Sequence, residues 1–114
     1  MSTADAVAYN AELDARVEEV LGSWGATRKK MFGGTGYMLN GNMTAGVYGD
    51  ELIVRLSPEE GAEALALPTV RPFDISKNPM SGWLLVGSEG LDDESLVDWL
   101  ERARDFVVGL PPKQ

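Results

Sequence analysis

Residues 37–56 read YMLNGNMTAGVYGDELIVRL and contain two tight-turn signals. Asn40-Gly41 is the strongest short-range hairpin signal, because both central positions of a type I′ turn require positive φ. Gly49-Asp50 predicts a second two-residue turn between apolar-rich segments. Strands joined by such short turns are antiparallel neighbours, so the stretch predicts a three-stranded meander.

The two turns also predict the register of the meander. The expected partners are Met38 with Met43, Tyr37 with Thr44, Val47 with Leu52, and Ala45 with Val54. Because side chains alternate along a strand, the sheet should have two different faces. The apolar face, expected to meet the core, holds Gly34, Gly36, Met38, Met43, Ala45, Val47, Leu52, Val54 and Leu56. The mixed face, expected to be partly wet, holds Tyr37, Leu39, Asn42, Thr44, Gly46, Tyr48, Glu51, Ile53 and Arg55.

Three helices are predicted around this meander. Residues 5–22 carry apolar side chains at helical spacing. Residues 57–66 begin with Ser57 as a helix N-cap, followed by a proline at the first helical position. Residues 92–109 carry a second long apolar stripe, with Asp92 as the N-cap.

The remaining strands lie between the second and third helices. Trp83-Leu84-Leu85-Val86 predicts one strand, and Phe73-Asp74-Ile75 predicts a weaker one. Consecutive strands with short turns, separate from the helices, indicate an α+β fold. We therefore expect one domain over residues 1–114, with an antiparallel β-sheet meander flanked by N-terminal, short middle and C-terminal helices.

The glycine-rich segment RKKMFGGTG, residues 28–36, does not fit a nucleotide-binding loop. A phosphate-binding loop places its lysine after the glycines, whereas Lys29 and Lys30 precede them. The dinucleotide fingerprint opens a helix, whereas this segment enters a hairpin. On the predicted core face, Gly34 and Gly36 leave room for either a closely packed helix or a small pocket.

Composition excludes several classes of site. The chain has no cysteine, which excludes disulfides and thiolate metal sites, and no histidine, the commonest general base. We expect no metal and no cofactor. No apolar run is long enough to span a membrane, and the N-terminus does not resemble a signal peptide, so we expect a cytoplasmic protein with no membrane partner.

Charge is the main clue to partners. The formal net charge is −8, and the acids concentrate toward the two ends of the chain. Because nucleic-acid binding depends on cation–phosphate attraction, we expect no direct binding to duplex DNA. Residues 28–30 form the one run of cations. Alternation places Arg55 beside Tyr37 on the mixed face, so this corner could bind an acidic partner segment or a small anion. Ordinary ion pairing with the flanking helices is the alternative.

Two further groups of side chains are candidate sites. Trp83 and Tyr37 could stack on a planar ligand, although a tryptophan is more often a core residue. The clustered acids at residues 92–94 are explained by a helix N-terminus, where they complement the helix dipole. The sequence therefore predicts binding residues at Lys29, Lys30, Tyr37, Arg55 and Trp83, and no catalytic residues.

The chain resembles the N-terminal domain of the TfoX/Sxy family over residues 9–112. The residues that carry the resemblance are Lys30, Met31, Phe32, Gly33 and Gly34, together with Pro79, Met80, Gly82 and Trp83. The resemblance implies a compact α+β domain. The founding members regulate natural competence at promoters, together with the cyclic-AMP receptor protein. They carry a second, C-terminal domain that we do not expect here.

The resemblance provides no catalytic motif. It implies a non-enzymatic regulatory or protein-interaction module, with transcription co-regulators as its relatives and a protein partner that the sequence does not name. The alternative is a small-ligand or anion-binding domain that uses the mixed sheet face. Either a monomer or a homodimer is compatible with the sequence.

Overall fold

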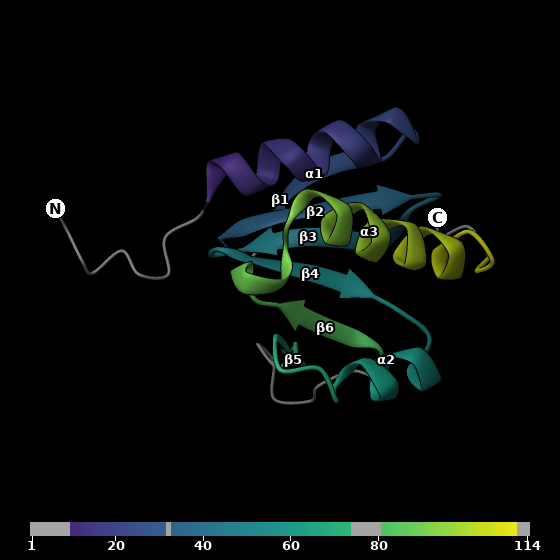
Figure 1. Cartoon of the computed structure of the whole chain (residues 1–114). Helices are drawn as coiled ribbons and strands as arrows, with labels where there is room; N and C mark the ends of the chain where they lie inside the picture. Colours follow the sequence, from purple (N-terminus) through teal and green to yellow (C-terminus); the bar gives the residue numbers. More distant parts are fainter. Residues whose placement is uncertain (1–9, 32, 74–80, 112–114) are drawn as a thin grey trace, which may run out of the picture.

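The computed structural model describes residues 10–31, 33–73 and 81–111. It has three α-helices and one six-stranded antiparallel sheet, which is the α+β fold predicted (Figure 1). The helices are α1 (Ala11–Ser23), α2 (Pro58–Ala64) and α3 (Asp93–Val107), and a short 3-10 turn covers Ser88–Gly90. The strands are β1 (Thr27–Met31), β2 (Gly34–Leu39), β3 (Asn42–Tyr48), β4 (Glu51–Arg55), β5 (Val70–Pro72) and β6 (Trp83–Val86).

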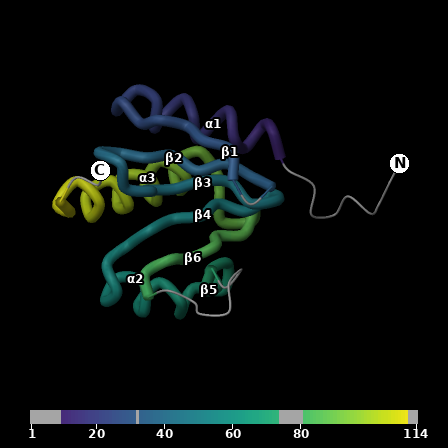
Figure 2. The backbone as a smooth tube through the Cα atoms, turned by 180° about the vertical axis from the view of Figure 1, so that it is seen from behind, coloured from purple at the N-terminus to yellow at the C-terminus, as the bar shows by residue number. Residues whose placement is uncertain are grey.

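The sheet has the order β1-β2-β3-β4-β6-β5, and every neighbouring pair is antiparallel. Helices α1 and α3 contact each other and cover one face, which we call the helix face (Figure 1). Viewed from behind, strands β2 and β3 pass in front of α3, and α1 runs along the top of the view beside β1 (Figure 2). We call this opposite side the open face, because none of the described helices crosses it there. None of the helices within the described ranges is long and apolar enough to cross a membrane.

The predicted N-caps of the second and third helices, Ser57 and Asp92, are confirmed. The first helix was predicted over residues 5–22, but Asn10 is extended and caps a helix that begins at Ala11. Asn10 Oδ1 accepts a hydrogen bond from Leu13 N at 3.0 Å, and Ser57 Oγ accepts one from Glu60 N at 3.1 Å. Asp92 caps α3 in the same way, and its Oδ1 lies 2.7 Å from the backbone N of Ser95. Residues 5–9 of the first predicted helix lie outside the described residues.

Two strands differ from the prediction. Strand β1 was missed because TRKKM has too few apolar side chains to show an alternating pattern. A strand was expected at Phe73-Asp74-Ile75, whereas β5 covers Val70–Pro72 and ends just before Phe73. Phe73 N still donates to Trp83 O at 3.0 Å, whereas Asp74 and Ile75 lie outside the described residues.

Both predicted turns are present. Asn40 has φ 54° and Gly41 has φ 81°, as a two-residue turn of this type requires. Three of the four predicted pairs are confirmed, namely Met38 with Met43, Val47 with Leu52, and Ala45 with Val54.

The fourth pair is wrong, because Tyr37 lies opposite Ala45 rather than Thr44. Since Met38 still lies opposite Met43, Thr44 has no residue opposite it and forms a β-bulge in β3. A bulge of one residue exchanges the two faces of the strand beyond it. The predicted faces are therefore right from Ala45 onward and wrong for β2 and the start of β3.

This exchange of faces explains the observed burial. Tyr37 is only 1% exposed and packs in the main core with Ala45 and Val47, so its predicted place on a wet face is wrong. The face predicted to be wet in fact holds five buried side chains, those of Tyr37, Leu39, Asn42, Thr44 and Ile53. Ile53 lies on the open face, where it forms a second small cluster with Phe73 and Leu85.

The glycines of β2 and β3 allow close packing of the two strands. A Cβ atom on Gly34 would lie 2.0 Å from Val47 O, and one on Gly46 would lie 2.1 Å from Thr35 O. Gly36 faces the open side, where an added Cβ would meet Met31 Sδ at 2.8 Å and Met43 Cε at 3.2 Å. No described helix packs over these glycines, because neighbouring strands and methionine side chains occupy that space. The predicted pocket is found in part: a pocket of about 240 Å³ is lined by Gly34, together with Lys30, Met31, Gly33 and Thr35, but Gly36 does not line it.

Candidate functional site

The predicted cation run lies on β1, the edge strand of the sheet. Lys29 pairs in register with Gly36 and Lys30 with Thr35, so alternation directs the two lysines to opposite faces. Both side chains are exposed. The outer edge of β1 faces no strand of the described chain, so its backbone can accept an additional strand.

The two lysines differ from Arg28 in their ionic partners. Arg28 bonds to Asp14, with its guanidinium nitrogens 2.6 and 3.2 Å from Asp14 Oδ2. Neither lysine ammonium lies within 4.0 Å of a carboxylate among the described residues. The alternative prediction was that acids of the flanking helices pair with this cation run. Among the described residues, it is confirmed for Arg28 and not for Lys29 or Lys30.

The corner predicted from Lys29, Lys30, Arg55 and Tyr37 is not assembled. Arg55 lies on β4, with β2 and β3 between it and the lysines. Its guanidinium lies 5.0 Å from the ring centroid of Trp83 and 5.7 Å from that of Phe106. The structure thus brings Arg55 and Trp83 together, as neighbours on paired strands, but away from Lys29 and Lys30.

Tyr37 belongs to a polar network below α1 that the sequence analysis missed. Its hydroxyl donates to Asp14 Oδ1 at 2.5 Å, and the hydroxyl of Thr35 donates to the same oxygen at 3.0 Å. Asp14 is buried, and Arg28 binds its other oxygen. A signal was present in the sequence, because Asp14, Val17 and Leu21 share one helical face.

This network is suited to structure rather than to proton transfer. Burial, together with the hydrogen bond to Asp14, raises the pKa of Tyr37 well above its ordinary value. The phenol therefore remains protonated at neutral pH and acts as a hydrogen-bond donor. The arrangement fastens α1 to β1 and β2 through one buried carboxylate.

Gly82 of the family motif lies at the junction of α2 and β6. It has φ +88°, and an added Cβ would lie 2.2 Å from Leu56 O. Its carbonyl accepts a hydrogen bond from Leu56 N at 2.8 Å, and its Cα would lie 2.7 Å from a Cβ on Gly61. No other residue fits this junction, which gives the glycine of the motif a structural role.

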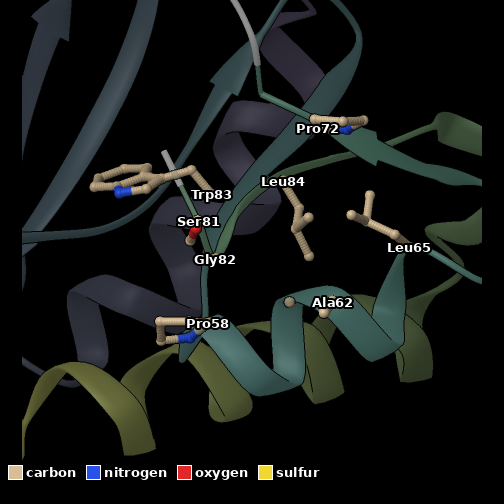
Figure 3. A pocket seen from close by; sticks show the side chains of 9 residues that line it. Pro58, Ala62, Leu65, Pro72, Ser81, Gly82, Trp83 and Leu84 are labelled. Carbon is tan, nitrogen blue, oxygen red and sulfur yellow. The ribbon is translucent and has the colours of Figure 1, made fainter. Parts of the chain in front are cut away.

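A small pocket of about 200 Å³ adjoins this junction (Figure 3). It is lined by Pro58, Gly61, Ala62, Leu65, Pro72, Ser81, Gly82, Trp83 and Leu84. Leu65 and Leu84 point toward each other, whereas the Trp83 ring points to the other side of its strand (Figure 3). Ser81 is therefore the one side-chain polar group of the lining near this space. Ligand sites combine an apolar lining with several convergent polar groups, which this pocket does not offer.

A larger hollow of about 620 Å³ lies on the open face, next to the edge strand. We call it the Lys29 hollow. It is lined by Gly25, Thr27, Lys29, Met38, Asn40, Gly41 and Met43. Its lining combines two methionine side chains with one ammonium group and contains no carboxylate.

Other features of the described chain add no chemistry to these sites. No cluster of acidic side chains that could hold a metal ion occurs within residues 10–31, 33–73 and 81–111. Gly33, with φ 79°, lies between β1 and β2, and Gly34 begins β2 opposite Met31. The remaining motif residues Phe32, Pro79 and Met80 lie outside the described residues.

The comparisons with known proteins returned one finding. The family model described as the TfoX N-terminal domain matches residues 19–107 of the 114. No curated protein and no solved structure matches the chain.

Proposed function

The chain belongs to the TfoX N-terminal domain family, and we propose that it is a non-enzymatic protein-interaction module of the kind that serves transcription co-regulators. Its binding element is the edge strand β1, which receives an acidic, extended segment of a partner protein. The family is not a known enzyme family, in keeping with this proposal.

One observation carries the proposal. Lys29 and Lys30 are exposed on an edge strand, and no carboxylate of the described chain pairs with them, although the protein has a net charge of −8. Two unpaired cations on a free strand edge suit a partner strand that carries carboxylates. Main-chain hydrogen bonds of such an added strand supply affinity, and the side chains next to it supply specificity.

The same charge distribution argues against direct binding to duplex DNA. Arg28 is already bonded to Asp14, so this strand offers two cations for phosphate contacts. Proteins that bind DNA without sequence preference make several such contacts. Any role at a promoter then runs through a partner protein.

The test is an NMR titration of isotope-labelled protein with the peptide Thr-Thr-Glu-Glu-Thr-Ser-Thr-Thr. Since an added strand can run in either direction, the reversed peptide is titrated as well. We expect the amide signals of residues 27–31 to shift, and K29Q/K30Q to weaken binding roughly 3- to 10-fold, as two exposed ion pairs would.

The control variant is A15E/A66E, which lowers the net charge by the same two units at exposed sites elsewhere. It should leave the affinity unchanged. A peptide with glutamines in place of both glutamates is the second control. The proposal is overturned if that neutral peptide binds equally well, or if K29Q/K30Q and A15E/A66E behave alike.

A further inference from the structure

Three methionines lie together on the open face of the sheet, beside the edge strand. Met31, Met38 and Met43 are partly exposed, and the first and last of these meet over Gly36. Met38 lies opposite Met43 in the hairpin, and both line the Lys29 hollow. Met43 also packs against the cluster formed by Ile53, Phe73 and Leu85. The hollow therefore has an apolar, adaptable wall, because methionine side chains repack readily around different shapes.

The position of the hollow relates it directly to β1. Thr27 and Lys29 both line it, and they are two residues apart on the same face of that strand. A strand added at the outer edge of β1 would place its own side chains beside these two. One of its side chains would enter the hollow near Thr27, and another would lie against the Lys29 ammonium.

Lys30 adds a third constraint, because it projects to the helix face next to Thr35. A partner residue beside Lys30 is therefore adjacent in sequence to the residue beside Lys29. The side chain in the hollow lies two residues beyond the one at Lys29. The charge of the site favours acids at both lysine positions, since no acidic side chain of the described chain lies in the hollow.

We propose that the Lys29 hollow binds a large apolar side chain of an acidic partner strand. The partner segment then reads acid-acid-x-apolar in one chain direction and apolar-x-acid-acid in the other. The inference rests on the proposed function and deepens it, because it names the chemistry of the partner segment. The hollow has room for an aromatic ring, and its methionines offer the sulfur–aromatic contacts that favour one.

The test replaces the serine of the acidic peptide with phenylalanine, giving Thr-Thr-Glu-Glu-Thr-Phe-Thr-Thr, in both chain directions. In one direction, the phenylalanine peptide should bind roughly tenfold more tightly than the serine peptide, through burial of part of its ring. The ring should also shift the ε-methyl signals of Met38 and Met43, which the serine peptide should leave nearly in place.

Two variants examine the hollow itself. Met38→Gln replaces an apolar side chain of the hollow's lining with a polar one, and Thr27→Trp places a large side chain at its exposed rim. In each variant, the phenylalanine peptide should bind less than twofold more tightly than the serine peptide. Leu67→Gln is the matched control, because it removes an exposed apolar side chain outside both sites. Thr27 is exposed on an edge strand, so Thr27→Trp should fold and still tests the hollow if Met38→Gln fails to fold.

The outcomes separate this inference from the proposed function. If the serine and phenylalanine peptides bind equally, and K29Q/K30Q still weakens both, the edge-strand function stands and the hollow is not the anchor site. If the Leu67→Gln variant loses the advantage as fully as Met38→Gln does, the inference is likewise overturned. If no acidic peptide shifts residues 27–31, both proposals fail.

Discussion

The hydroxyl of Tyr37, on strand β2, lies 2.5 Å from Oδ1 of Asp14, on helix α1. This hydrogen bond joins two buried residues that are 23 positions apart in the chain. It shows that the second strand turns its tyrosine toward the helices and not toward solvent. The candidate binding surface follows from this orientation, because the methionines of the same hairpin are then left on the open face.

Tyr37→Phe should destabilise the protein by about 1–2 kcal/mol. The substitution keeps the ring in the core but removes one of the hydrogen bonds that satisfy a buried carboxylate. Urea unfolding measures the change. Tyr48→Phe is the control, because that half-buried ring packs on the open face, and its change should stay below about 0.5 kcal/mol. Equal losses in the two variants would contradict a special role for the Asp14 bond.

Stability should fall at alkaline pH in a way that depends on Tyr37. Its pKa in the folded protein is raised above the ordinary value of 10.0, mainly by burial and then by Asp14. The unfolded chain therefore loses this proton first, and the stabilisation, fully present below pH 10, declines as the pH rises further. Urea midpoints between pH 9 and pH 11 should decrease more steeply for wild type than for Tyr37→Phe. Parallel pH profiles would show that other groups cause the decline.

Gly46→Ala should destabilise the protein by roughly 2 kcal/mol or more. Its new Cβ would lie 2.1 Å from the backbone oxygen of Thr35, so β2 and β3 would have to separate. Gly22→Ala is the matched control, since the residue is helical and a Cβ there meets no atom within 4 Å apart from its chain neighbours and the backbone of its own helix. That control should be neutral or stabilising by up to about 1 kcal/mol. Thermal unfolding of both variants gives the comparison, and an unaffected Gly46→Ala would contradict the close strand approach.

Gly41→Val should cost roughly 1 kcal/mol or more. Gly41 has φ 81°, a conformation that a β-branched side chain resists. Gly41→Asn keeps a residue that tolerates positive φ and should cost clearly less. Thermal unfolding of the two variants measures the difference in stability between them. If valine and asparagine were equally tolerated, the turn would not depend on a left-handed residue at this position.

The isolated chain should not bind duplex DNA at physiological salt. Its net charge is −8, and non-specific binders usually reach dissociation constants of about 10⁻⁴ to 10⁻⁶ M. Fluorescence anisotropy with a labelled duplex should show no saturation through the low micromolar range. A saturating isotherm that weakens with added salt would instead assign a direct DNA-binding role to the domain.

Features that depend on local chemistry were readable from the sequence. Ser57 and Asp92 cap their helices, and Asn40-Gly41 closes the hairpin, because each feature involves residues only a few positions apart. The α+β fold and the run of strands from 34 to 55 follow from these signals. The lysine pair was likewise visible as the one cation run, although its place on an edge strand was not.

Tertiary packing decided the rest. The residues next to Thr44 give no sign of a bulge. Its effect is on tertiary packing, because the extra residue lets Tyr37 and Ala45 both pack in the main core. The face of β2 therefore depended on where Asp14 lies, and that carboxylate comes from a distant helix. Because the bulge exchanges the two faces of β2, Tyr37 lies in the core and not in the predicted binding corner, and Met38 lines the Lys29 hollow. Local chemistry determined the turns and caps of this protein, whereas contacts between distant segments determined which side chains a partner can reach.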